Sequence, residues 1–174
     1  MTTIVIDCKN QKVYADDLTT CTRWTSNFLF QKDQEWLLYR DGKQKAYKKD
    51  GVIITGSGDA SQIQEFVNSY PDHICKPFDE NTHIFVVMPK KYSLQIIKFN
   101  AVKKNRFTKS LKWVDECWVQ QDGYVTSGSG KNYVEGALAA GVHPIDAILA
   151  ASRLDSSTGS HVNCFEFDDE EQPK

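Results

Sequence analysis

Hydrophobic and polar positions alternate along much of the chain with the two-residue period that is typical of β-strands. Residues 2–8 and 12–16 show it first, and the polar turn Lys9-Asn10-Gln11 between them predicts a β-hairpin. Similar short apolar runs predict further strands at 27–30, 36–40, 51–55, 83–88, 92–99, 124–127 and 161–167.

Polar residues between these runs predict where the chain turns. We expect turns at Lys32-Asp33-Gln34-Glu35 and at the hairpin-type dipeptide Asp41-Gly42. Pro89-Lys90-Lys91 predicts the turn of a second apolar hairpin. The pattern around 113–118 is too mixed to favour a strand or a helix.

Helical spacing replaces this alternation in three segments. The first follows Asp59, a residue suited to cap a helix, and should end before Pro71. Gly141 closes the second, and Pro144 opens the third. The apolar residues at helical spacing are Ala60, Ile63, Phe66 and Val67, then Tyr133, Val134, Ala137, Leu138 and Ala140, then Ile145, Ile148 and Leu149.

Long hairpins beside clustered helices predict a layered α+β fold. The length of 174 residues and the hydrophobic share of 40% suit one domain, which we expect to span residues 1–167. Residues 168–174 are mostly acidic and predict a flexible tail.

Composition excludes several classes of function. The net charge of −2 offers no basic surface for nucleic acid. No apolar stretch is long enough to span a membrane, and the start of the chain lacks the pattern of a signal peptide, so we expect a cytoplasmic protein. Five scattered cysteines form no Cys-x-x-Cys pair, and the four histidines suggest no metal site, so we expect neither metal nor cofactor.

Chemistry is suggested first by Thr2, which directly follows Met1. Methionine before a small residue is usually removed, and removal would leave a threonine with a free α-amino group. Such a residue is a nucleophile with its own base, since the hydroxyl attacks and the amine takes the proton. The α-amino group has a pKa near 8, so a useful fraction is neutral at physiological pH.

Two glycine-serine turns each follow a strand and precede a helix: Gly56-Ser57-Gly58 and Gly128-Ser129-Gly130. Glycines there let the backbone approach a ligand, and the helix N-terminus presents N–H groups to negative charge. Lys131 follows the second turn, but the full phosphate-loop pattern is absent, so two tight turns are the alternative interpretation. Asp16 and Asp155, each taken alone, suit a turn or the end of a helix.

Six short stretches, in order, resemble the HslV-type peptidase and the proteasome β-subunits. The resemblance spans residues 2 to about 167. In length and in the last stretch, the chain most resembles compact proteasome-like proteins of phages. The stretches are Thr2-Thr3-Ile4-Val5, Val13 to Thr20, Gln44-Lys45-Ala46-Tyr47, Ile53 to Ala60, Gly128-Ser129-Gly130 with Tyr133, and Asp155 with Thr158-Gly159.

The resemblance implies an N-terminal-nucleophile (Ntn) hydrolase with a four-layer αββα sandwich built on two mixed sheets. One departure concerns the family's long second helix. The matching segment, Pro71 to Asn81, is short and contains Pro71 and Pro77, so we expect this helix to be reduced. Because that helix contributes to subunit contacts in the family, the departure bears on ring assembly.

The resemblance also implies roles for individual residues. Thr2 would be the nucleophile, Lys45 would lower the proton affinity of its amine and hydroxyl, and Asp16 would hold Lys45 in place. Lys43 and Lys48 lie close enough for a shifted alignment to move the lysine role. The remaining residues would be Ser129, Asp155 and Thr158 in a polar network around the amine, Gly56 as the oxyanion donor, and Thr19, Thr20, Cys21, Ile54 and Gly58 in substrate binding.

The activity that the resemblance implies is that of a threonine peptidase on peptide or unfolded protein, working in a homo-oligomer. Any ATP dependence would come from a separate ATPase unfoldase, since the chain has no ATPase motifs. A catalytically silent assembly subunit is one alternative, and a small-molecule amide hydrolase of the same nucleophile class is another.

Overall fold

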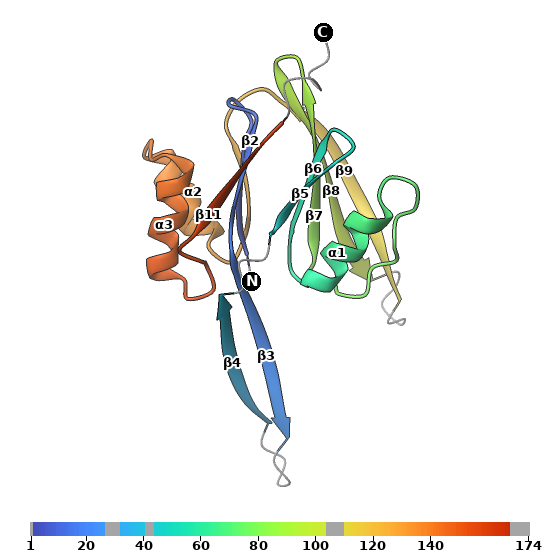
Figure 1. The fold of residues 1–174 in the computed structure, drawn as a ribbon, viewed down its shortest axis with the longest axis vertical. Coiled ribbons are helices and arrows are strands. Elements are labelled where there is room, and N and C mark those ends of the chain that lie inside the picture. Colours follow the sequence, from blue (N-terminus) through green and yellow to red (C-terminus); the bar gives the residue numbers. More distant parts are fainter. Residues whose placement is uncertain (1, 27–31, 41–43, 104–109, 168–174) are drawn as a thin grey trace.

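The computed structural model describes residues 2–26, 32–40, 44–103 and 110–167 (Figure 1). They form eleven strands and three helices. The first sheet has the order β10-β1-β2-β11, and all its neighbours are antiparallel. Its strands are β1 (Thr3–Asp7), β2 (Lys12–Asp16), β10 (Tyr124–Gly128) and β11 (Val162–Glu166).

Strand β1 lies between β10 and β2, so the start of the chain is held on both sides. Thr3 pairs with Gly128 of β10, and Ile4 pairs with Ala15 of β2. Every residue of β1 is buried. The N-terminal strand is therefore an interior part of the fold.

The second sheet has the order β5-β6-β7-β8-β9 and is also antiparallel throughout. The resemblance implied mixed sheets, and that expectation is wrong for both, since hairpins or long reversals connect the paired strands. The strands are β5 (Ala46–Lys49), β6 (Val52–Ser57), β7 (His83–Lys90), β8 (Ser93–Lys103) and β9 (Leu111–Gln120).

Three apolar cores separate four layers. One core lies between the sheets and includes Ile6 and Phe85. A second packs α1 (Ala60–Ser69) on the five-stranded sheet through Phe66. The third packs α2 (Lys131–Ala139) and α3 (Pro144–Leu154) on the outer face of the four-stranded sheet (Figure 1). The order helix, sheet, sheet, helices is the one that the resemblance implies.

Strands β3 (Leu18–Ser26) and β4 (Lys32–Arg40) form a separate antiparallel ribbon that extends away from the sandwich (Figure 1). The turn expected at Lys32-Asp33-Gln34-Glu35 is wrong, because these residues begin β4. Their polar side chains suggested a turn, but a two-stranded ribbon outside the sandwich does not need an apolar face. The expected strand 27–30, the turn Asp41-Gly42 and the tail 168–174 lie outside the described residues.

Most other predicted elements are confirmed, including the helix capped by Asp59, whose carboxylate accepts from the Gln62 N–H. The pattern did not identify β9, an edge strand with a largely exposed surface. The residues from 71 to 82, all of which the structure describes, contain no helix. The reduced helix that we expected in this segment is therefore absent from it.

Buried Gln62 of α1 holds the segment that replaces this helix. Its Oε1 accepts from the N–H groups of Phe78 and Asp79, at 2.5 and 2.8 Å. Its side chain is completely buried. The Gln62 amide therefore accepts from two backbone N–H groups that a helix would otherwise pair with its own carbonyl oxygens.

We predict that Gln62→Leu lowers the free energy of unfolding by about 1–3 kcal/mol, because two backbone N–H groups lose their buried acceptor. Chemical denaturation would measure this change. Gln64→Leu, on the exposed face of the same helix, is the control and should change stability by less than about 0.5 kcal/mol. Equal effects of the two substitutions would contradict the role given to Gln62.

Candidate active site

Asp16, at the end of β2, is a fully buried carboxylate with donors from three separate segments. Its Oδ1 accepts from the Thr3 N–H at 2.8 Å and from Lys45 Nζ at 3.0 Å. Its Oδ2 accepts from the Gly159 N–H at 2.6 Å. Burial of a carboxylate is costly unless donors replace water, and here both oxygens are satisfied.

Lys45 lies just before β5, and its side chain is only 9% exposed. Nζ bonds to Asp16 Oδ1 and also to the backbone oxygen of Leu18. The Thr55 hydroxyl donates to the Lys45 oxygen at 2.9 Å and holds the backbone there. The positive charge is thus kept beside the start of the chain by a buried partner and two flanking strands.

Asp155 follows the last residue of α3 and gathers donors on the other side of β1. Its Oδ2 accepts from the Thr158 hydroxyl at 2.7 Å, and its Oδ1 accepts from the Ser157 N–H at 3.0 Å. Burial acts to raise the pKa of Asp155, but hydrogen bonds from the hydroxyls of Ser129 and Thr158 and from the Ser157 N–H outweigh it. The pKa therefore lies below its ordinary value.

The first two threonines join these groups. The backbone carbonyl oxygen of Thr2 accepts from the Ser129 N–H at 3.1 Å. The Thr3 hydroxyl lies 2.7 Å from the Thr158 hydroxyl and accepts from the Gly130 N–H at 3.1 Å. Both threonines are buried.

The glycines of the second glycine-serine turn are required by this close approach. Gly128 has a φ of +102°, and a Cβ there would lie 1.4 Å from the backbone carbonyl oxygen of Thr2. A Cβ on Gly130 would lie 2.5 and 2.6 Å from the hydroxyl oxygens of Thr158 and Thr3. The turn therefore approaches the N-terminal strand of the same chain, whereas the sequence suggested either an approach to a ligand or a simple tight turn.

Hydrogen bonds connect all six residues proposed as catalytic. The connection runs from Lys45 through Asp16 to Thr3, then through Thr158, Asp155 and Ser129 back to Thr2. Sequence reasoning missed Thr3, although a polar residue in an otherwise apolar strand run was a usable signal. It also missed the backbone groups of Leu18 and Gly159, which no residue-type pattern reveals.

Gly56 lies in β6 opposite Ile84, and this strand of the second sheet contacts β1 and β10. A Cβ there would lie 2.8 Å from the His83 oxygen and 3.1 Å from the Ile63 side chain, so close packing of α1 favours glycine. Next to it, the hydroxyls of Ser57 and Ser127 are 2.9 Å apart and join the two sheets.

The residues expected to bind substrate lie in three different environments: an apolar core, a contact with Thr82, and strand β3. Ile54 is fully buried in the core between α1 and the sheet, which leaves it no surface for a substrate. Gly58 has a φ of +117° and packs against Thr82. Thr19, Thr20 and Cys21 lie on β3, paired with Tyr39, Leu38 and Leu37 of β4, and only their backbone is described. Lys43 lies outside the described residues.

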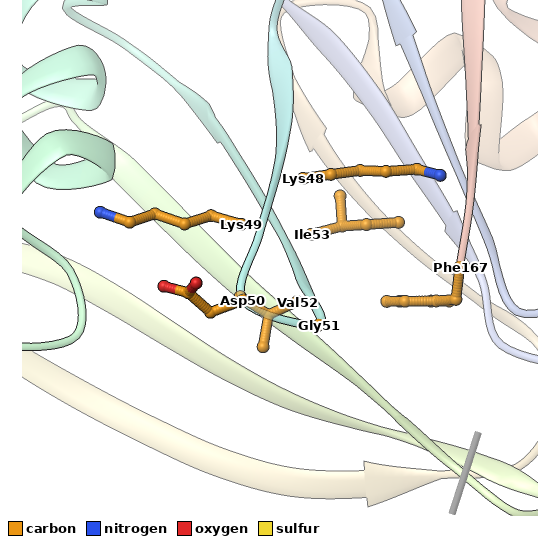
Figure 2. Close-up of a pocket in the computed structure, with 7 residues that line it drawn as sticks. All are labelled: Lys48, Lys49, Asp50, Gly51, Val52, Ile53 and Phe167. Atoms are coloured by element: carbon orange, nitrogen blue, oxygen red, sulfur yellow. The ribbon is translucent and has the colours of Figure 1, made fainter. Parts of the chain in front are cut away.

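A cavity of about 220 Å³ lies at the far end of the β5–β6 hairpin. In Figure 2, Lys48 and Ile53 extend toward Phe167, whereas Lys49 extends the opposite way. Lys48 follows Lys45 by three residues, which is about 10 Å along the strand. Lys48 therefore belongs to this cavity, and it is Lys45 that bonds Asp16.

Within the described ranges, no helix could cross a membrane. Among the same residues, no group of three or more histidine, cysteine or acidic side chains is arranged to hold a metal ion. The four cysteines that the structure describes are free thiols.

Comparison with solved structures shows the fold. The protein BPH of Thiobacillus denitrificans, solved in complex with epoxomicin, is 13% identical with a TM-score of 0.57, and the match covers 95% of this chain and 99% of that one. Eukaryotic HslV from Trypanosoma brucei is 12% identical with a TM-score of 0.51, covering 94% of this chain and 97% of that one. No family model and no curated protein sequence matches the chain. The chain thus has the fold of HslV-type proteins, as the resemblance implied.

We predict an acid-dependent loss of stability that involves Asp155. Because its folded-state pKa is lowered, Asp155 stabilises the fold above its unfolded pKa of about 3.9, and this contribution is lost as pH falls through the folded pKa. Denaturant unfolding from about pH 7 to pH 2 should show a smaller acid loss in Asp155→Asn than in the unmodified protein. The control Asp115→Asn, at an exposed site on β9, should keep the full loss.

Proposed function

We propose that this protein is a threonine-type hydrolase of peptide bonds, with Thr2 as the nucleophile after removal of Met1. The observation that carries the proposal is the closed hydrogen-bond network around Thr2 and Thr3. It includes a buried lysine–aspartate pair on one side and Asp155 with its donors on the other. The fold shared with HslV and with an epoxomicin-binding protein supports it.

In the proposed reaction, the Thr2 hydroxyl oxygen attacks the peptide carbonyl carbon while the α-amine takes the hydroxyl proton. The backbone N–H of Gly56 stabilises the oxyanion. The carbon–nitrogen bond then breaks, the proton passes to the leaving amine, and an ester to Thr2 remains. Water hydrolyses this ester and restores the threonine.

Lys45 favours this chemistry through its charge. A positive charge near Thr2 lowers the proton affinity of the amine, so more of the amine is neutral and able to act as a base. Asp16 offsets the cost of burying Lys45 and holds Nζ at one place. Ser129, Asp155 and Thr158 then fix the backbone of Thr2 through the Ser129 N–H and the Thr3 hydroxyl.

The proposed substrate is a peptide or unfolded protein with an uncharged, moderately apolar side chain at the cleavage site. This follows from the uncharged residues expected to bind it. Since Ile54 is in the core and Gly58 packs on Thr82, the role rests on Thr19, Thr20 and Cys21 of β3.

A catalytically silent subunit is the alternative, since the same fold can serve assembly alone. A silent subunit has no need for a buried lysine beside the start of the chain. Here Lys45 and Asp16 are kept with both carboxylate oxygens satisfied. A small-molecule amide hydrolase would use the same site and would differ in its substrate.

We predict that the protein forms a homo-oligomer in the cytoplasm, as HslV-type peptidases enclose their sites. A separate ATPase could then supply unfolded substrate, and a phage-encoded chain would act in the host cytoplasm. Light scattering at micromolar concentration should give a mass well above that of one 19.8 kDa chain. The missing helix makes this test informative, and a monomer mass would contradict the assembly.

For the activity, we predict that intact mass shows loss of Met1 and that epoxomicin labels Thr2. Thr2→Ala should fold but not react, and Thr2→Ser should keep part of the activity because it retains hydroxyl and amine. Lys45→Ala should lose about a hundredfold or more in peptide hydrolysis, the scale of a lost electrostatic stabiliser.

Lys48→Ala is the matched control, since Lys48 lines the distant cavity and should not affect turnover. Turnover by Thr2→Ala would overturn the mechanism, and full turnover by Lys45→Ala would show that the lysine role lies elsewhere. An unmodified protein that keeps Met1 and reacts with neither probe would support the silent subunit.

A further inference from the structure

We propose that Thr3 is a positioning residue whose hydroxyl orients Asp155 through Thr158 and whose backbone N–H orients Asp16. Thr3 would thereby join the two halves of the site. This inference rests on the proposed function of Thr2 and adds to it a residue for which neither the family pattern nor the comparisons suggest a role.

The direction of the hydrogen bonds follows from the groups involved. A hydroxyl has one proton to donate, and an ionised carboxylate can only accept. Thr158 uses its proton for Asp155 Oδ2 at 2.7 Å. In the 2.7 Å contact between the two hydroxyls, Thr3 must therefore be the donor.

The Thr3 hydroxyl also has its acceptor side occupied, by the Gly130 N–H at 3.1 Å. The chain of donors thus runs from Gly130 through Thr3 and Thr158 to Asp155. Successive hydrogen bonds in one direction polarise one another, so each strengthens the next. The lowered pKa of Asp155 agrees with this arrangement.

The backbone of Thr3 reaches the other half of the site. Its N–H donates to Asp16 Oδ1 at 2.8 Å, the same oxygen that accepts from Lys45. Thr3 is completely buried and directly follows Thr2 along the chain. Its two polar groups therefore determine where Thr2 lies relative to both Lys45 and Asp155.

The space at Gly130 is an independent observation for the same arrangement. A Cβ there would come within 2.6 Å of the Thr3 hydroxyl and 2.5 Å of the Thr158 hydroxyl. The residue that opens α2 must therefore lack a side chain for these two hydroxyls to meet. The local backbone is shaped around the Thr3–Thr158 contact.

The test compares Thr3→Val, which removes the hydroxyl at nearly constant volume, with Thr3→Ser, which keeps it. Both retain the backbone bond to Asp16. Thr3→Val should lower kcat about tenfold or more with KM nearly unchanged, because the buried hydroxyl orients groups and does not touch the substrate. Thr3→Ser should stay within about threefold of the unmodified protein, since the donor is present.

Two further measurements separate positioning from general stability. A double-mutant cycle of Thr3→Val with Thr158→Val should be non-additive, because both changes interrupt one chain of bonds. Carbon NMR of the Asp155 carboxyl should show its pKa raised in Thr3→Val and unchanged in Thr3→Ser. Unchanged kcat and unchanged titration in a folded Thr3→Val protein would overturn the proposal.

The carboxyl titration also distinguishes this proposal from the proposed function. If the unmodified protein proves inert, the function fails, yet a pKa of Asp155 that rises in Thr3→Val still supports the positioning role, and an unchanged pKa refutes it. If Thr3→Val does not fold, Thr3→Ala also removes the hydroxyl but has a smaller side chain, and kcat and the Asp155 titration can be measured in that variant. An active protein with an unaffected variant would leave the function standing and remove the role of Thr3.

Discussion

The site and much of its surroundings depend on one buried carboxylate, that of Asp16. A charge without water needs donors in place, and Asp16 takes them from β1, from the segment before β5 and from the loop after α3. These segments belong to both sheets and to the C-terminal third of the chain. The carboxylate therefore joins parts of the sequence that no local preference would bring together, and it does so beside the first residues.

The arrangement couples function to the sandwich itself. Lys45 lies just before β5 of the second sheet and Asp16 ends β2 of the first, so their ion pair connects the two sheets. The Ser57–Ser127 contact crosses the same space next to Gly56 and the second glycine turn. A change in how the sheets pack would therefore displace the charge from Thr2, which explains why a site of this kind needs a rigid double sheet.

The fold tolerates large changes elsewhere. Identity to the two compared structures is only 12–13%, yet the matches cover nearly the whole chain. In the segment that replaces the second helix, two backbone N–H groups bond to the buried Gln62 amide of α1. The four layers persist because they depend on alternating apolar positions and on three apolar cores, which many sequences can supply.

By itself, the sequence determined most strands and all three helices, because alternation, helical spacing and caps are local properties. The residues proposed for the site came from the resemblance of short stretches and not from these patterns. The pattern did not predict the start of β4 at Lys32–Glu35, nor β9. Both carry polar side chains, because β4 lies outside the sandwich and β9 is largely exposed. Only the tertiary structure decided which lysine meets Asp16, what the glycine turn approaches, and that Thr3 joins both halves. Those outcomes depend on contacts between residues up to 155 positions apart, and burial, not local pattern, selects them.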